Sequence, residues 1–166
     1  MQLSEHFSLR ELTVSASAKR RGLDNTPNSA ALANLKNLAT FILEPLRNLY
    51  GKPILVTSGY RSQAVNKVVG GAAHSQHTQG KAADIKCQSD TREGNKELFD
   101  AIIKSGLPFD QVINEYNYDW VHVSYNPMYQ RGQIMKCERK NGRAIYTDIS
   151  NTYMLDGRTA KSYVKK

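Results

Sequence analysis

Two histidines and one aspartate stand out in the sequence because their types and spacing could hold a metal ion. His77 and Asp84 lie seven residues apart in the segment SQHTQGKAAD, and His122 lies in the segment WVHVSY. Gly80 stands between the first two and permits a tight turn, because glycine adopts positive φ without steric cost. The two alanines before Asp84 permit close packing behind it. The three side chains can therefore converge although they are separated in the chain.

Two imidazoles and one carboxylate suit Zn²⁺, and three protein ligands with a fourth position for water are typical of a catalytic zinc site. An ordinary structural role is the alternative. His122 alternates with two valines as in a strand, where a histidine is often a hydrogen-bonded core or interface group. Cys87 and Cys137 fall in no ligand pattern and are too few for a disulfide framework, so we expect two buried thiols.

The composition predicts a basic globular protein. The 166 residues fit one domain, and 40% hydrophobic and 23% charged residues exclude a disordered chain. A net charge of +8 favours a polyanionic partner such as nucleic acid, anionic lipid or cell wall. No basic and aromatic motif supports specific nucleic-acid recognition, and no apolar run approaches the roughly 18 residues of a membrane span, so we expect no membrane insertion.

Signals for helices dominate the first 51 residues. Ser8 and Glu11 have the spacing of a capping box. Ser29 opens the longest helical pattern, in which Pro45 should kink or restart the helix and Gly51 should end it. Apolar residues recur there at steps of three and four and predict one buried face, formed by Leu32, Leu35, Ala39, Ile42, Leu46 and Leu49.

The remaining chain predicts an α+β domain over residues 1–149, with a small antiparallel sheet flanked by helices. We expect strands at 53–57, 82–86, 110–114 and 120–125, and a helix at 92–105. The segment 66–80 is rich in glycine and small residues and should be irregular. A hairpin is expected through residues 134–147 with Asn141-Gly142 as its turn, and a basic tail at 150–166.

The candidate ligands lie in a recognisable motif. Ser75-x-His77-x-x-Gly80-x-Ala82-x-Asp84, followed by Trp120-x-His122, resembles the zinc-ligand signature SxHxxGxAxD…WxH of the zinc D,D-peptidases. That family shares the hedgehog/D,D-peptidase fold and includes D-alanyl-D-alanine carboxypeptidases, vancomycin-resistance dipeptidases and phage L-alanyl-D-glutamate endolysins. The segments SGYRS and VGG and the opening FSLRELTVSASAKRRGLDNTP also resemble its small phage and bacterial members. The resemblance covers roughly residues 4 to 135.

The resemblance implies that His77, Asp84 and His122 bind zinc and that Arg61 is the cationic group facing the substrate. A guanidinium beside the metal can hold a peptide carboxylate or the oxyanion of a tetrahedral intermediate. Ser75 either hydrogen-bonds near the ligands or caps the turn. Trp120 either lines the substrate cleft or packs in the core.

The resemblance also implies an acidic general base three positions before the last ligand, and Asp119 fills that position. Residues three apart in a regular strand face opposite sides, so Asp119 can reach the metal only if it precedes the strand, in a turn. Glu115 is the rival, because phage members often carry an acid at that earlier position.

These expectations together describe a zinc metallopeptidase, a monomer, that cleaves a bond in peptidoglycan stem peptides. The bond could be D-Ala-D-Ala, L-Ala-D-Glu or a cross-bridge. The N-terminus lacks the apolar segment of a signal peptide, which favours a phage-type lysis enzyme, made in the cytoplasm and released to the cell wall by a holin. The alternative is a zinc-containing module that binds wall or protein without turnover, but such a module needs neither Arg61 nor an acid near His122.

Overall fold

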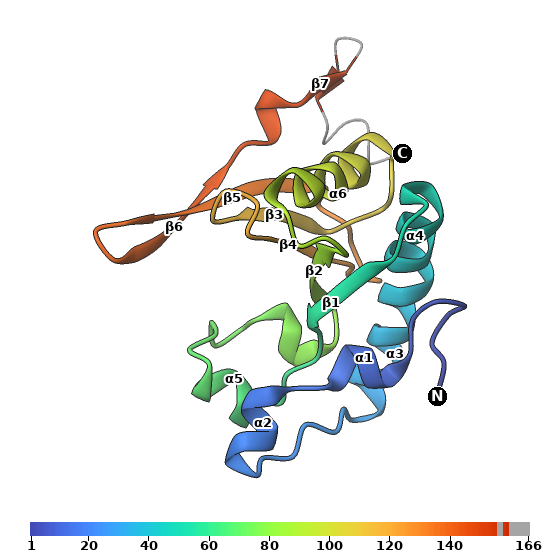
Figure 1. The fold of residues 1–166 in the computed structure, drawn as a ribbon, viewed down its shortest axis with the longest axis vertical. Coiled ribbons are helices and arrows are strands. Elements are labelled where there is room, and N and C mark those ends of the chain that lie inside the picture. Colours follow the sequence, from blue (N-terminus) through green and yellow to red (C-terminus); the bar gives the residue numbers. More distant parts are fainter. Residues whose placement is uncertain (156–157, 160–166) are drawn as a thin grey trace.

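The computed structural model describes residues 1–155 and 158–159 and shows one large sheet with helices packed against it (Figure 1). The helical segments are α1 (Leu9–Thr13), α2 (Ala16–Arg21), α3 (Ser29–Leu38), the π-helical turn η1 (Ala39–Leu43), α4 (Glu44–Tyr50), α5 (Gln63–Val68), the 3-10 turn η2 (Gln76–Gln79), α6 (Arg92–Lys104) and the 3-10 turn η3 (Ser150–Thr152). The strands are β1 (Ile54–Ser58), β2 (Ala82–Cys87), β3 (Gln111–Glu115), β4 (Trp120–Ser124), β5 (Gln133–Lys140), β6 (Arg143–Asp148), β7 (Met154–Leu155) and β8 (Arg158–Thr159).

The six-stranded sheet has the order β1-β2-β4-β3-β5-β6, and β7 pairs with β8 separately. Neighbouring strands of the large sheet are antiparallel except β3 and β5, which are parallel. The predicted α+β class, with a largely antiparallel sheet and flanking helices, is confirmed, and the arrangement is consistent with the hedgehog/D,D-peptidase fold.

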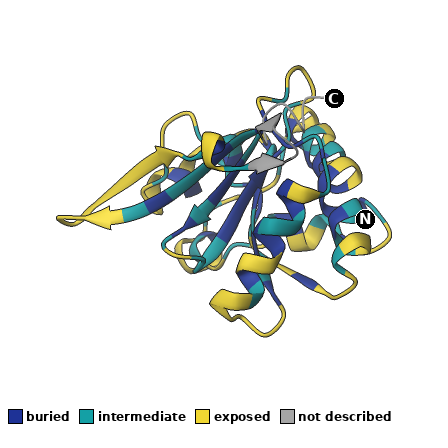
Figure 2. Cartoon of the chain, turned by 90° about the horizontal axis from the view of Figure 1, so that it is seen from above, coloured by how far each residue is buried: buried dark blue, intermediate teal, exposed yellow. Residues whose placement is uncertain are grey.

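One face of the sheet forms the hydrophobic core with α3, η1, α4 and α6. The central strands of the sheet are largely buried (Figure 2). Val121 and Val123 of β4 and Ile85 of β2 lie in this core and are fully buried. Burial of each such side chain contributes about 1.5–3 kcal/mol relative to exposure. Because side chains alternate along a strand, Asp84 and His122 point to the opposite face, which the core helices leave open.

The long helical pattern is interrupted as Pro45 predicted. Pro45 stands in the first turn of α4, after the π-helical turn η1, and Gly51 ends α4 with φ 74°. A π turn forms i→i+5 hydrogen bonds, so it shifts the residues after it around the helix axis. An apolar pattern counted in steps of three and four residues across the π turn therefore no longer marks the buried face at the end of α4. Leu46 is buried, but Leu49 is 62% exposed, and its predicted place in the buried face is wrong.

Most other predicted elements are confirmed with shifts of a residue or two at their ends. Ser8 and Glu11 form the capping box of α1, and Asn141 and Gly142 connect β5 to β6 with positive φ at both positions. The segment 66–80 is not wholly irregular. The helix α5 reaches into it because Ser62 caps its first turn and Val65 is buried, and η2 occupies residues 76–79.

The β5–β6 hairpin projects from the body of the molecule at the sheet edge farthest from β1 (Figure 1). After it, Ser150 is buried and its hydroxyl accepts a hydrogen bond from the Ile134 amide at 3.0 Å. Of the predicted basic tail at 150–166, residues 156–157 and 160–166 lie outside the described part, and the domain boundary at residue 149 stays a prediction. Cys87 and Cys137 are free and buried, as expected.

Candidate active site

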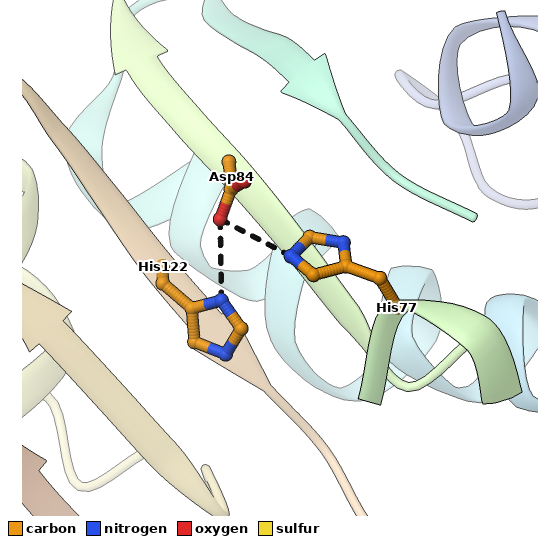
Figure 3. Close-up of side chains that lie close together, drawn as sticks. All are labelled: His77, Asp84 and His122. Carbon is orange, nitrogen blue, oxygen red and sulfur yellow. Dashed lines mark hydrogen bonds and ion pairs between the residues drawn. The ribbon is translucent and has the colours of Figure 1, made fainter. Parts of the chain in front are cut away.

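His77, Asp84 and His122 converge on the open face of the sheet (Figure 3). Asp84 Oδ1 lies 3.3 Å from His77 Nε2 and 3.2 Å from His122 Nδ1. The two imidazole rings are 5.2 Å apart between centroids. One atom from each of the three residues lies within 4.8 Å of the others. The structure therefore brings the three predicted ligands together.

Strand pairing positions two of the three ligands. Asp84 of β2 is directly opposite His122 of β4 in the antiparallel register, so both side chains stand on the same face. His77 comes from η2, whose start is capped by the Ser75 hydroxyl, which accepts from the His77 amide at 3.2 Å. Gly80 ends η2 with φ 72° and turns the chain directly into β2.

The ring of His77 is oriented by a backbone carbonyl. His77 Nδ1 lies 2.7 Å from the Gly59 oxygen. A carbonyl only accepts, so Nδ1 carries a proton, and Nε2 is the ring nitrogen that faces Asp84. This outer hydrogen bond is the kind that sets the tautomer of metal-binding histidines. Gly59 itself has no room for a side chain, because a Cβ would lie 2.3 Å from the Leu12 carbonyl oxygen.

The charge state and spacing of these groups fit a metal ion. Burial raises the pKa of Asp84, but the charges and hydrogen bonds of His77 and His122 outweigh it and hold that pKa below its usual range. Asp84 is thus ionised, which suits a metal ligand. Atoms bound about 2.0–2.1 Å from a tetrahedral zinc ion lie roughly 3.3 Å from one another, which matches the two distances to Asp84 Oδ1. His122 Nε2 is buried without a hydrogen-bond partner.

Arg61 lines the same cleft, a cavity of about 740 Å³. Its amide donates to the His77 carbonyl at 3.1 Å, which ties the loop after β1 to η2. Its Nε is buried without a hydrogen-bond partner. Burial lowers the pKa of the guanidinium and the charge of Asp84 opposes that shift. Arg61 therefore places a cation beside the three ligands.

Glu115 also lines the cleft, at the end of β3, and only 6% of its surface is exposed. It stands opposite Trp120, which is two residues before His122 on β4, so the three side chains share one face. Burial is the main cause that raises the pKa of Glu115 to about 7, while the charge of His122 lowers it and that of Asp84 raises it. An acid that titrates near neutrality is suited to proton transfer.

Asp119 lies in the turn between β3 and β4, as its predicted role requires, but it lines a neighbouring hollow with Asn117 and Glu138 and not the cleft of the three ligands. Its amide donates to the Glu115 carbonyl at 2.9 Å. The turn begins with three consecutive residues in the left-handed region, at 116–118, and they reverse the chain direction between β3 and β4. Of the two acids considered, the structure brings Glu115 and not Asp119 into the cleft.

Ser75 and Trp120 both line the cleft. Ser75 caps η2, which was one of its two predicted roles, and Trp120 lies on the cleft side of β4, with its ring 5.3 Å from that of Tyr116. Sequence reasoning missed other lining residues. Gln76 occupies a variable position of the motif, and Arg131 and Tyr146 belong to the segment after β4, where no pattern marked them.

A family model described as peptidase M15 matches residues 5–124, which is more than half of the chain. The chain belongs to the peptidase M15 family. A curated relative, the zinc D-Ala-D-Ala carboxypeptidase of Streptomyces albus G, is 46% identical over 59 residues. The aligned part is 34% of this chain and 23% of that relative. The predicted membership of a zinc D,D-peptidase family is confirmed.

The segment that matches the M15 family contains the three predicted ligands, Arg61 and both acids. The cleft extends beyond it, because Tyr129, Arg131, Arg139 and Tyr146 also line it. The hairpin β5–β6 and the loop before it therefore add a wall to the cleft that the family match does not cover. No helix in the described part of the chain combines the length and the apolar character that a bilayer crossing needs.

Proposed function

We propose that this M15 peptidase is a Zn²⁺ enzyme that hydrolyses a peptide bond in peptidoglycan stem peptides. The observation that carries the proposal is the position of Asp84 Oδ1, 3.3 Å from His77 Nε2 and 3.2 Å from His122 Nδ1, in a cleft that also holds Arg61 and Glu115. The similarity to a carboxypeptidase named for zinc and D-Ala-D-Ala supports the choice of metal and substrate.

His77, Asp84 and His122 would hold the metal. Zn²⁺, when bound, supplies a Lewis acid that polarises a carbonyl and makes water more acidic. Glu115 takes the proton from the attacking water and passes it to the leaving amine, and its burial in the cleft suits that role. Arg61 stabilises the negative charge that develops on the carbonyl oxygen, where fixed positive charge is most effective.

The biological role that we propose is lysis by a phage-type enzyme that acts at the cell wall as a monomer, after synthesis in the cytoplasm and release by a holin. The net charge of +8 supports action at an anionic wall. Binding of wall or protein without turnover is the rival reading. It is disfavoured by the presence of both Arg61 and Glu115 in the cleft.

Release of new amino groups from purified peptidoglycan by the zinc-loaded protein tests the proposal. We expect release that stops with a chelator and in His122→Ala, and that persists in His6→Ala, a histidine that does not line the cleft. Mass spectrometry of the soluble products names the bond from their new termini. A folded, zinc-loaded protein that releases no amino groups from any wall preparation would refute the enzymatic proposal.

A further inference from the structure

A buried carboxylate at the edge of the cleft has no part in the chemistry above. Asp110 is 2% exposed and precedes β3. Its Oδ1 accepts from the amide and from Nε of Arg131, both at 2.9 Å, and its Oδ2 accepts from Nη2 of Arg131 at 2.9 Å and from Nε2 of Gln76 at 2.7 Å. Each oxygen of this carboxylate thus accepts two hydrogen bonds.

This network orients the guanidinium of Arg131. The bonds from Nε and Nη2 hold one edge of the planar group against Asp110, and a guanidinium has five N–H donors in all. The side chain is 44% exposed and lines the cleft. Arg131 therefore presents donors to the cleft in a fixed orientation, unlike a mobile surface arginine, because its anchor is buried.

The hydrogen-bond network around Asp110 lies in the same cleft as the three predicted metal ligands but at a distance from them. His122 is opposite Ile113 of β3, and Asp110 is three residues earlier, which is about 10 Å along a strand. Gln76 joins the two regions, because it bonds to Asp110 and directly precedes His77. Arg131 thus lies in a part of the cleft away from the three predicted metal ligands. It also lies outside the segment that the M15 match covers.

We propose that Arg131 is a specificity-determining residue that binds a free carboxylate of the stem peptide, with Asp110 as its positioning residue. The inference rests on the proposed function. A guanidinium edge with two parallel donors matches a carboxylate in shape and charge. A carboxamide of the same size offers one acceptor and one donor, so it loses both a bond and the charge. Asp110 offsets the net charge of Arg131, so recognition depends on hydrogen-bond geometry at short range.

The test is calorimetric binding of soluble stem peptides to the zinc-loaded full chain. The peptides form matched pairs in which each free carboxylate in turn is converted to a carboxamide. For one carboxylate we expect amidation to weaken binding about tenfold or more, as for hydrogen bonds to charged groups. In Arg131→Gln the acid and amide forms should bind equally. The double variant Asp110→Asn/Arg131→Gln should behave alike, and it avoids an unpaired buried charge that could prevent folding.

Arg143→Gln is the matched control, because it removes one positive charge from an exposed position of β6 that does not line the cleft. It should keep the preference for the acid. If Arg131→Gln weakens binding of the acid and the amide form by the same factor, the preference for the acid remains. Arg131 then only anchors its loop, and the inference is overturned. A wild-type protein that binds no stem peptide or shows no preference would also overturn it. Hydrolysis of the same peptides is scored separately: a preference that depends on Arg131 without any cleavage would refute the proposed function alone.

Discussion

Gly80 should be a position where one methyl group damages both the fold and the metal site. It ends the turn that carries His77 and leads into the strand that carries Asp84, with φ 72°. A Cβ at this position would lie 2.4 Å from the Ala31 carbonyl oxygen and 3.1 Å from the Leu35 side chain. The first contact is with helix backbone, which cannot rotate away as a flexible side chain would.

The cost of Gly80→Ala has two parts. A non-glycine residue in the left-handed region costs about 1–2 kcal/mol, and an overpacked site typically costs about 1–3 kcal/mol more. We therefore expect the free energy of unfolding to fall by about 2–5 kcal/mol. Gly142→Ala is the matched control, because Gly142 has φ 76° and nothing within 4 Å of an added Cβ. Its free energy of unfolding should fall only by the cost of the left-handed conformation, about 1–2 kcal/mol.

Urea unfolding of both variants in the presence of a chelator measures the two losses without a contribution from metal. Zinc titration then measures the site. Because Gly80 sets the path between His77 and Asp84, zinc affinity should fall about tenfold or more in Gly80→Ala, the scale seen when the support of a metal ligand is lost. It should be unchanged in Gly142→Ala. Equal losses of stability in the two variants would refute the argument from the Ala31 contact.

Three further outcomes test the site. Glu115→Gln should lower kcat by about 10²–10⁴, the usual contribution of a general base, whereas Asp119→Asn should change it less than about tenfold; a larger effect at Asp119 would reverse the assignment. Zinc should raise the Tm of the wild-type protein, since a ligand at about 1,000 times its Kd stabilises by about 4 kcal/mol, and calorimetric scans of Asp84→Ala should show no such rise. Burial raises the pKa of Asp110, but the hydrogen bonds from Arg131 and Gln76 outweigh it and hold the pKa below its usual value. Asp110 therefore stabilises the fold above its unfolded pKa of about 3.9, and this stability is lost as pH falls through the lower folded pKa. The free energies of unfolding of the wild type and of Asp110→Asn, measured from pH 6 to pH 2, should converge at the acid end. A difference between the two that stays constant with pH would contradict the assignment.

Local patterns in the sequence were sufficient to predict most elements and the three candidate metal ligands that converge in the cleft. His77, Asp84 and His122 could be predicted because each lies in an element that neighbouring residues determine. His77 lies in a capped turn that ends at a glycine, and the other two lie in strands with alternating apolar residues. The capping box at Ser8 and the Asn141-Gly142 turn were predicted for the same reason. Their hydrogen bonds and dihedral angles involve residues only a few positions apart.

Tertiary structure decided which acid enters the cleft and where the helix face ends. Asp119 and Glu115 are four residues apart, and only strand pairing and the left-handed turn at 116–118 direct one of them toward His122. Leu49 became exposed because the π turn before α4 shifted the helix register. Asp110 and Arg131 are 21 residues apart in sequence, with no periodicity to connect them. Such pairs arise only when distant segments pack together. Local sequence therefore determined the candidate metal ligands, and the packing of strands and loops determined the cleft around them.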